Sequence, residues 1–279
     1  MGGVVGGSSV SVSVLGLGSF GEKSANSAIP RRRCTSFIAK AASSVDQTLS
    51  QIRNSGVIAC LRANSAEVAL EAARVALSGG ISVVSHFDVF FSFYGFKLFE
   101  FLVFSLEIVA STPGVFEVIQ QLVEEWPATA LGVGTVLNVT DGKKAINAGA
   151  KFLMSPVFVK EILNDVRESK VLYIPGAMTP TEIFNAYSAG AKLVKVYPVS
   201  ALGGTQYIKA LSKPLSHIPM VASQGIRLDL IGEYIARGAS AVVLSDAIFN
   251  KEALAQRNYD VIHRLAHLAT LQGNEAAKW

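Results

Sequence analysis

The amino-acid sequence predicts an α/β protein with a single (β/α)8 TIM barrel, preceded by a disordered leader, and three observations carry this prediction. Short apolar segments with strand character alternate with segments of ten to fifteen residues in a helical pattern, as in parallel βα units. Small-residue helix ends recur at Gly149, Gly190 and Gly238, with spacings of 41 and 48 residues, or two βα units per repeat. No GxGxxG motif follows the first strand, so a closed barrel fits better than an open dinucleotide-binding sheet.

Residues 1–44 have the composition of an organelle transit peptide. They contain ten serines, five basic residues and one acid, so their net charge of +4 equals that of the whole chain. We expect a leader for the plastid stroma of a chloroplast, with the mitochondrion or a disordered native tail as alternatives. The remaining residues 45–279 carry no net charge, which gives no reason to expect nucleic-acid binding by the folded part.

The barrel domain is predicted for residues 45–279, and its first strand is the buried apolar run at 56–62. An alanine-rich helix starts at 64–67 and ends at the glycine pair 79–80. A second strand is formed by GGISV and LEIVAS, which brings the number of strands to eight. The other strands, each short and apolar, lie at residues 129–136, 151–155, 171–175, 192–198, 219–223 and 241–245.

Residues 84–105 separate the two parts of the second strand and break the rhythm of the chain. They hold eight of the fifteen phenylalanines and show no clean period of 2 or 3.6. We interpret them as a retained intron or a mis-predicted exon boundary, and a genuine insertion acting as a lid or contact surface is the alternative. Asp88, Lys97 and Glu100 leave no apolar run long enough to span a membrane.

The second strand can accommodate these 22 extra residues only by looping them out or by adopting a new register. A slip by one residue turns every side chain of a strand to the opposite face, which would move Glu107 from the barrel interior to the helix layer. We therefore expect the chain with residues 84–105 to fold poorly or to be catalytically weak, and the chain without them to form the barrel.

Cysteines and histidines give no sign of a metal or cofactor site. Cys34 and Cys60 are too few for a disulfide framework, which favours a reduced compartment. His217, His263 and His267 fall at helix ends or on the last helix, so a mechanism with histidine metal ligands is not expected. We expect no cofactor.

Lys195 is the candidate nucleophile, because it stands in the apolar strand at 192–198. An apolar surrounding disfavours the charged ammonium, and a neutral lysine amine forms Schiff bases with carbonyl compounds. A lysine that extends to solvent is the alternative. Active sites of such barrels lie at the carboxyl ends of the strands. Those ends carry Arg62, Glu107, Ser111, Thr135, Pro156, Tyr197, Ser223, Gly225, Ser245 and Asp246.

Between residues 55 and 273, apart from the insert, the chain resembles the 2-keto-3-deoxy-6-phosphogluconate / 2-keto-4-hydroxyglutarate (KDPG/KHG) aldolases, as a plant-like member. The motifs that carry the resemblance are GGISV…LEIV, LGVGTVLN, AKFLMSP, YIPGAMTPTE, KLVKVYPVSALGG and VASQGI. The resemblance implies a metal-free class I aldolase, a lyase that acts on a 2-keto acid, releases pyruvate and is usually a homotrimer.

The resemblance also implies roles for individual residues. Lys195 would form the imine with pyruvate, and Glu107 would move protons, through water. Thr135 and Pro156 would border the pyruvate carboxylate, and Tyr197 would stack beside the imine. The substrate-binding set expected from the strand ends and the family is Arg62, Ser111, Thr135, Pro156, Tyr197, Ser223, Gly225 and Ser245.

Three residues depart from the family pattern. Ser111 stands where an arginine near the substrate carboxylate is common, and Arg62 is the candidate to supply that charge. Gln224 adds bulk to a phosphate loop, and Asp246 places an acid beside the expected anion, unless it caps a helix and points away. We therefore expect an unphosphorylated 4-hydroxy-2-keto acid as substrate. The alternatives are a weakened or non-enzymatic barrel and a phosphate-binding barrel without imine chemistry.

Overall fold

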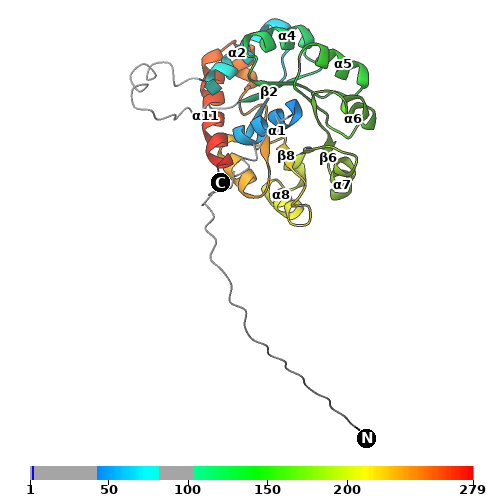
Figure 1. Ribbon diagram of the computed structural model, residues 1–279. Helices are drawn as coiled ribbons and strands as arrows, with labels where there is room; N and C mark the ends of the chain where they lie inside the picture. The colour runs from blue at the N-terminus through cyan, green and yellow to red at the C-terminus, as the bar shows by residue number, and fades with distance from the viewer. Residues whose placement is uncertain (1, 3–42, 82–103, 279) are drawn as a thin grey trace, which may run out of the picture. The chain divides into compact units, whose positions relative to one another are not determined.

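A computed structural model of the chain describes residues 2, 43–81 and 104–278 (Figure 1). The leader predicted for residues 1–44 therefore lies outside the described residues except for Gly2, Ser43 and Ser44. Most of the insert predicted at 84–105 lies outside them as well, so neither its origin nor the disorder of the leader is tested.

The strands of the described part form one parallel sheet in the order β5-β4-β3-β2-β1-β9-β8-β7-β6. Only Pro175 separates β5, which pairs with β4, from β6, which pairs with β7. These two strands are thus halves of one barrel strand, and they close the eight-stranded barrel that the sequence predicts. The strands are β1 Val57–Leu61, β2 Ser105–Val109, β3 Ala130–Gly134, β4 Phe152–Met154, β5 Leu172–Ile174, β6 Gly176–Ala177, β7 Val194–Val196, β8 Met220–Ser223 and β9 Ala241–Leu244.

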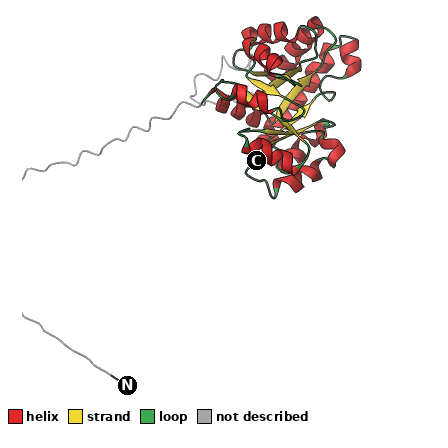
Figure 2. Ribbon diagram, turned by 90° about the vertical axis from the view of Figure 1, so that its right-hand side faces the viewer, coloured by secondary structure: helices red, strands yellow, loops and turns green. Residues whose placement is uncertain are grey.

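Helices surround the strands on the outside of the barrel (Figure 2). Side-chain caps fix several helix starts. The clearest is at Thr179, whose hydroxyl accepts from the Glu182 backbone N–H, while the Glu182 carboxylate accepts from the Thr179 N–H. The helices are α1 Ser44–Ser55, α2 Ala66–Ile81, α4 Val115–Glu125, α5 Val139–Asn147, α6 Lys160–Val166, α7 Pro180–Ser188, α8 Thr205–Ser212, α9 Ile231–Ala236, α10 Lys251–Ala255 and α11 Tyr259–Ala277, with the 3-10 turns η1 Val199–Leu202 and η2 Leu228–Leu230.

Two apolar cores hold the barrel together, and α1 belongs to the inner one. The outer core lies between strands and helices, whereas the inner core fills the barrel around Phe152, Met154 and Val221. Ile52 of α1 is fully buried in this inner core. Because α1 precedes β1 directly and bonds to backbone carbonyls just before β3 and β5, it closes the amino-terminal end of the barrel. The carboxyl end is left for a site.

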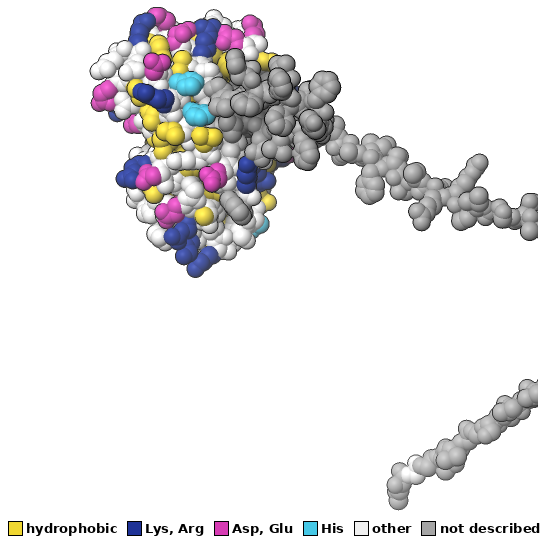
Figure 3. All heavy atoms as spheres, turned by 90° about the vertical axis from the view of Figure 1, so that its left-hand side faces the viewer, with side chains coloured by type: hydrophobic (Ala, Val, Ile, Leu, Met, Phe, Trp, Pro, Cys, Tyr) yellow, Lys and Arg dark blue, Asp and Glu magenta, His cyan; other side chains and the backbone are white. Residues whose placement is uncertain are grey.

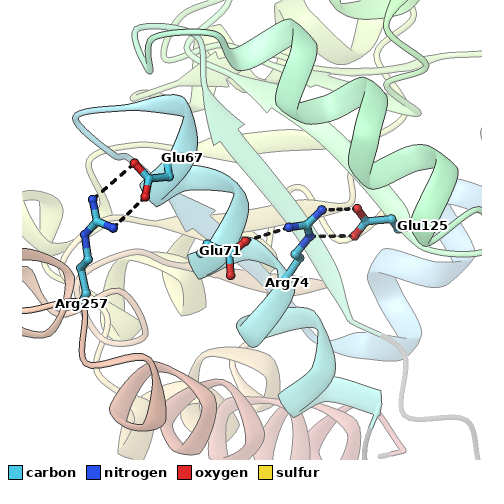
Figure 4. A network of polar contacts seen from close by, with 5 residues as sticks. All are labelled: Glu67, Glu71, Arg74, Glu125 and Arg257. Atoms are coloured by element: carbon cyan, nitrogen blue, oxygen red, sulfur yellow. Dashed lines mark hydrogen bonds and ion pairs between the residues drawn. The ribbon is translucent and has the colours of Figure 1, made fainter.

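Helix α2 is fixed by packing against α11 and by ion pairs (Figure 4). The Arg74 guanidinium donates to both carboxylate oxygens of Glu125 on α4, at 2.9 and 2.5 Å, and to Glu71 on its own helix. Near the start of α2, Glu67 accepts from Arg257, which lies between α10 and α11. Figure 3 shows the side of the barrel on which α11 lies, where the exposed Leu268 and Leu271 of that helix add apolar surface.

Helix α2 does not end at the glycine pair, which corrects the sequence-based prediction. The helix runs through Gly79 and Gly80 to Ile81, and the strand that was expected to start there begins only at Ser105. A Cβ on Gly79 would lie 2.7 Å from the His263 carbonyl oxygen of α11. The glycines therefore permit close packing on this side of the barrel instead of terminating the helix.

The last two residues of the predicted insert belong to the barrel, and the predicted register slip is wrong. Phe104 is buried, and Ser105 pairs with Ile58 of β1 and Ala130 of β3. Leu106 and Ile108 belong to the outer core, which leaves Glu107 facing the barrel interior. Alternation of apolar and polar side chains fixes the register of β2, because a slip would bury Glu107 among the helices.

Candidate active site

A cavity of about 430 Å³ opens at the carboxyl ends of the strands. Its wall is contributed by the ends of most strands and by the turns that follow them. The lining residues are Cys60, Arg62, Glu107, Val109, Thr135, Pro156, Lys195, Tyr197, Ser223, Gln224, Gly225, Ile226, Val243, Ser245, Asp246 and Ala247.

Lys195 lies at the centre of β7, and its side chain enters this cavity. It is 7% exposed, and its backbone N–H donates to the Pro175 carbonyl oxygen at 2.8 Å, which anchors β7 at the closing seam of the barrel. Its Nζ lies 5.2 Å from the ring centroid of Tyr197, two residues further on the same face of the strand. The structure thus places a shielded amine beside an aromatic ring.

Glu107 of β2 brings a carboxylate into the same cavity. It is 1% exposed, and its Oε2 has no hydrogen-bond partner among the described residues. Gly134 of β3 provides the room, since a Cβ there would lie 2.5 Å from this oxygen. A buried polar atom without a partner is costly, and Glu107 lines the cavity, so this carboxylate is suited to act on a water or substrate group there.

Cys60 is a site residue that the sequence analysis did not single out. It lies opposite Glu107 in the register of β1 and β2. Burial, followed by the charge and hydrogen bond of Glu107, raises the pKa of the thiol well above its ordinary value, although Lys195 and Arg62 act in the opposite direction. The thiol is therefore protonated at neutral pH. Its place two residues before Arg62 on the same strand face was the signal that could have revealed it.

The charges of the cavity are balanced. Arg62, after β1, and Asp246, after β9, add one cation and one acid to Lys195 and Glu107. The Asp246 carboxylate lies 4.0 Å from Nζ of Lys251. The alternative in which Asp246 caps a helix and points away is wrong, because Asn250 caps α10 and Asp246 lines the cavity.

Thr135 and Pro156 lie in the turns after β3 and β4, and a buried chain of hydrogen bonds connects these turns. The Tyr173 hydroxyl donates to Ser155 Oγ at 3.0 Å, and Ser155 Oγ donates to the Val136 carbonyl oxygen at 2.5 Å. Burial raises the pKa of Tyr173, so its hydroxyl remains a donor at neutral pH. This network fixes the distance between the two turns.

The loop after β8 carries Gln224 at a φ of 87°, in the region that favours glycine, followed by Gly225 at 71°. The Ser200 hydroxyl of η1 donates to Gln224 Oε1. A Cβ on Gly225 would collide with the Ser200 side chain. This hydrogen bond therefore holds the Gln224 side chain against η1, the turn that follows β7, at the rim of the cavity.

The structure brings together nearly all of the residues that the sequence predicts for the site. Ser111 is the exception, because β2 ends at Val109 and the chain turns away, which leaves Ser111 exposed outside the cavity lining. Apart from Cys60, the residues that sequence reasoning missed are apolar and gave no chemical signal. They are Val109, Ile226, Val243 and Ala247.

The described residues form no candidate metal site and no candidate membrane span. No group of three or more His, Cys, Asp or Glu side chains in residues 43–81 and 104–278 is placed to hold a metal ion. None of the helices that the structure describes is long and apolar enough to cross a membrane.

The fold and this site define a (β/α)8 barrel equipped for imine chemistry, because a shielded lysine amine and a buried carboxylate share one cavity at the catalytic end. The family model for KDPG and KHG aldolase matches residues 98–265, and the chain belongs to this family.

Similar proteins agree with this assignment. Over 131 residues the chain is 35% identical to the 2-dehydro-3-deoxy-phosphogluconate aldolase of Treponema pallidum, and the match covers 47% of this chain and 62% of that protein. It is 29% identical to the KHG/KDPG aldolase of Escherichia coli, over 59% of this chain and 77% of the relative. Among solved structures, KDPG aldolase of Legionella pneumophila with pyruvate captured as a covalent carbinolamine superposes with a TM-score of 0.65, at 24% identity, covering 79% of this chain and 96% of that one.

Proposed function

We propose that this protein is a class I, Schiff-base aldolase that cleaves a 4-hydroxy-2-keto acid into pyruvate and an aldehyde. The observation that carries the proposal is the placing of Lys195 and Glu107 in one cavity, the first as a shielded amine and the second with an unpartnered oxygen. The names of the relatives, and the carbinolamine captured in the Legionella enzyme, support the same chemistry.

The reaction follows from this pair. The Lys195 amine adds to the C2 carbonyl of the keto acid, and loss of water gives the iminium ion. Removal of the proton from the 4-hydroxyl group breaks the C3–C4 bond, releases the aldehyde and leaves the pyruvate enamine. The enamine takes a proton at C3, and water then hydrolyses the iminium ion to release pyruvate and restore the amine. Glu107 accepts and returns these protons.

The substrate class follows from the charges around the cavity. Arg62 and Lys195 face Glu107 and Asp246, so the site has no excess of positive charge for a dianionic phosphate. A unit charge pair of like sign at ~4 Å costs roughly 4 kcal/mol near a protein surface. Gln224 also occupies the loop that a phosphate would approach. We infer an unphosphorylated substrate, whose single carboxylate lies near Thr135 and Pro156.

Trapping of the imine tests the proposed activity. The full-length chain is incubated with pyruvate and reduced with borohydride, and the adduct is located by mass spectrometry. We expect it on Lys195. Lys151 is the matched control, because burial lowers its pKa, but it lies outside the cavity and its Nζ donates to the Pro127 carbonyl oxygen. Absence of a Lys195 adduct would favour a barrel without imine chemistry.

We also infer a homotrimer. Exposed apolar side chains support contacts between copies on the side of α5, α6 and α7, namely Leu137, Val157, Met178 and Phe184. Phe184→Glu should lower the molar mass measured by light scattering from that of a trimer to that of a monomer. Leu271→Glu on α11 is the control and should leave the mass unchanged.

The plastid stroma is the proposed location, and the composition of residues 1–44 supports it. Incubation of the radiolabelled chain with isolated chloroplasts and with mitochondria should give a shortened, protease-protected product in the chloroplasts. Protection in mitochondria alone would contradict the proposal.

A further inference from the structure

Cys60 is a partly buried thiol side chain in the cavity that the reaction above does not use. It lies on β1 opposite Glu107 on β2, and both side chains line the cavity together with Lys195. Hydrogen bonding to the Glu107 carboxylate is one cause of the raised pKa of the thiol, after burial and the charge of Glu107. Because burial keeps the thiol protonated, the S–H group is the donor and the carboxylate is the acceptor.

The carboxylate is enclosed from the other side by β3. Gly134 has no Cβ, and any side chain there would collide with Glu107. The Glu107 side chain therefore lies between the Cys60 thiol and the Gly134 backbone, with its Oε2 buried and without a hydrogen-bond partner among the described residues. Because Glu107 lines the cavity, its carboxylate is placed to exchange a proton with a molecule bound there.

The geometry points to Cys60 as a positioning residue for proton transfer, whose thiol donates to Glu107 and holds this carboxylate toward a substrate bound to Lys195. The inference rests on the proposed function and adds a residue to it. A role for Cys60 as a nucleophile does not fit, because the nucleophilic form is the thiolate and this thiol is protonated.

Two substitutions separate the hydrogen bond from the packing. Cys60→Val keeps the volume about the same but removes the donor, whereas Cys60→Ser keeps a donor. The reaction to follow is exchange of the pyruvate methyl protons with D2O, measured by NMR on the full-length chain. It requires proton removal from the iminium ion and proton return to the enamine, but no aldehyde.

For Cys60→Val we expect exchange to slow by about tenfold to a hundredfold, the effect of one lost hydrogen bond to a charged group. The acid side of the pH–rate profile should move to higher pH, because a carboxylate without its donor is less favoured in the charged form. The pyruvate concentration that gives half-maximal exchange should stay unchanged, and borohydride reduction should still give the Lys195 adduct. Cys60→Ser should restore most of the rate.

Ser105→Ala is the matched control, because Ser105 lies on the same strand as Glu107, is buried and has an unpartnered hydroxyl among the described residues, but does not line the cavity. It should leave the exchange unchanged. Exchange by Cys60→Val at the original rate with the original pH profile would overturn the inference, as would a loss in Cys60→Ser equal to that in Cys60→Val. An unaltered chain with neither adduct nor exchange would overturn the proposed function and the inference together.

Discussion

At the scale of single residues, the charge at the mouth of the cavity sets which substrate the site accepts. Asp246 is an exposed acid in the cavity lining, so its removal should favour phosphorylated substrates. We expect Asp246→Asn to raise kcat/KM for a phosphorylated 4-hydroxy-2-keto acid relative to its unphosphorylated analogue by about tenfold, since solvent screens most of the charge. Steady-state kinetics with both substrates measures this ratio.

The control for this prediction is Asp229→Asn, which removes an exposed acid that pairs with Arg227 and does not line the cavity. It should leave the ratio unchanged. An equal shift in both variants would show that overall charge, rather than the position of Asp246, determines the preference.

A second residue-scale prediction concerns the hydrogen bonds that connect the turns after β3 and β4. Tyr173→Phe removes the donor to Ser155 and the acceptor for the Val159 backbone N–H. Loss of this buried hydroxyl should lower the free energy of unfolding by about 1–3 kcal/mol. It should also raise the pyruvate concentration needed for half-maximal imine trapping, because Thr135 and Pro156 lose a fixed separation.

Urea denaturation and trapping at a series of pyruvate concentrations measure the two effects. Tyr207→Phe is the control, because that hydroxyl bonds to the Met178 carbonyl oxygen away from the cavity. An unchanged pyruvate dependence in Tyr173→Phe would mean that the turns are positioned by other contacts.

At the scale of elements, α1 is the part that closes the barrel. Ile52 fills the inner core, so Ile52→Ala should lower the free energy of unfolding by about 2–5 kcal/mol, the usual cost of a large cavity in a core. Urea denaturation followed by circular dichroism measures it. Arg53 lies on the exposed side of the same helix, so Arg53→Ala should change the free energy of unfolding by less than about 0.5 kcal/mol.

The ion pairs of α2 should make stability depend on acid pH. Arg257 lowers the pKa of Glu67, and Arg74 lowers that of Glu125, each from an ordinary value of 4.5. Because the folded-state pKa values are depressed, the stability they contribute is present above pH 4.5 and is lost as the pH falls through the folded-state values. The urea concentration at which half of the protein is unfolded should therefore decrease as the pH is lowered below 4.5.

The variant that tests this dependence is Glu125→Gln, which should be less stable than the unaltered chain at neutral pH and should lose less stability on acidification. The contribution of each pair is small, since both lie at the surface. An identical acid dependence in the variant would assign the effect to other carboxylates.

At the scale of the whole molecule, the barrel closes with β2 in the register that the site requires, although residues 82–103 precede it. We expect a variant that lacks residues 84–103, and thus keeps the buried Phe104 as well as Ser105 of β2, to form the Lys195 imine. Its melting temperature should be equal or higher, because a shorter connection costs less entropy on closing. The predicted weakness of the longer chain stays a prediction that this comparison tests, although the register slip does not occur in the structure.

Calorimetry and imine trapping on the two chains measure these outcomes. Deletion that abolishes trapping would show that residues 84–103 contribute to the site or to the stability of the barrel. Sequencing of the transcript across these codons separately tests the hypothesis of a retained intron.

Much of the molecule could be predicted from local patterns alone. Short apolar strands between helical segments indicated the barrel, and the motif around Lys195 indicated the aldolase family, which the family model confirms. These features depend on residues that are consecutive in the sequence, because the periodicity of burial and the chemistry of a strand end are local properties.

Local sequence patterns could not predict the contacts between segments that are distant in the sequence. Cys60 lies beside Glu107 because β1 and β2 pair in one particular register, and Ser111 leaves the cavity because the chain turns directly after β2. Near the end of α2, Gly79 permits the close approach of α11 and Gly80 that of Phe104, which no local rule foresees. Closing a barrel brings side chains together by long-range packing, so the partners of each catalytic group depend on the fold.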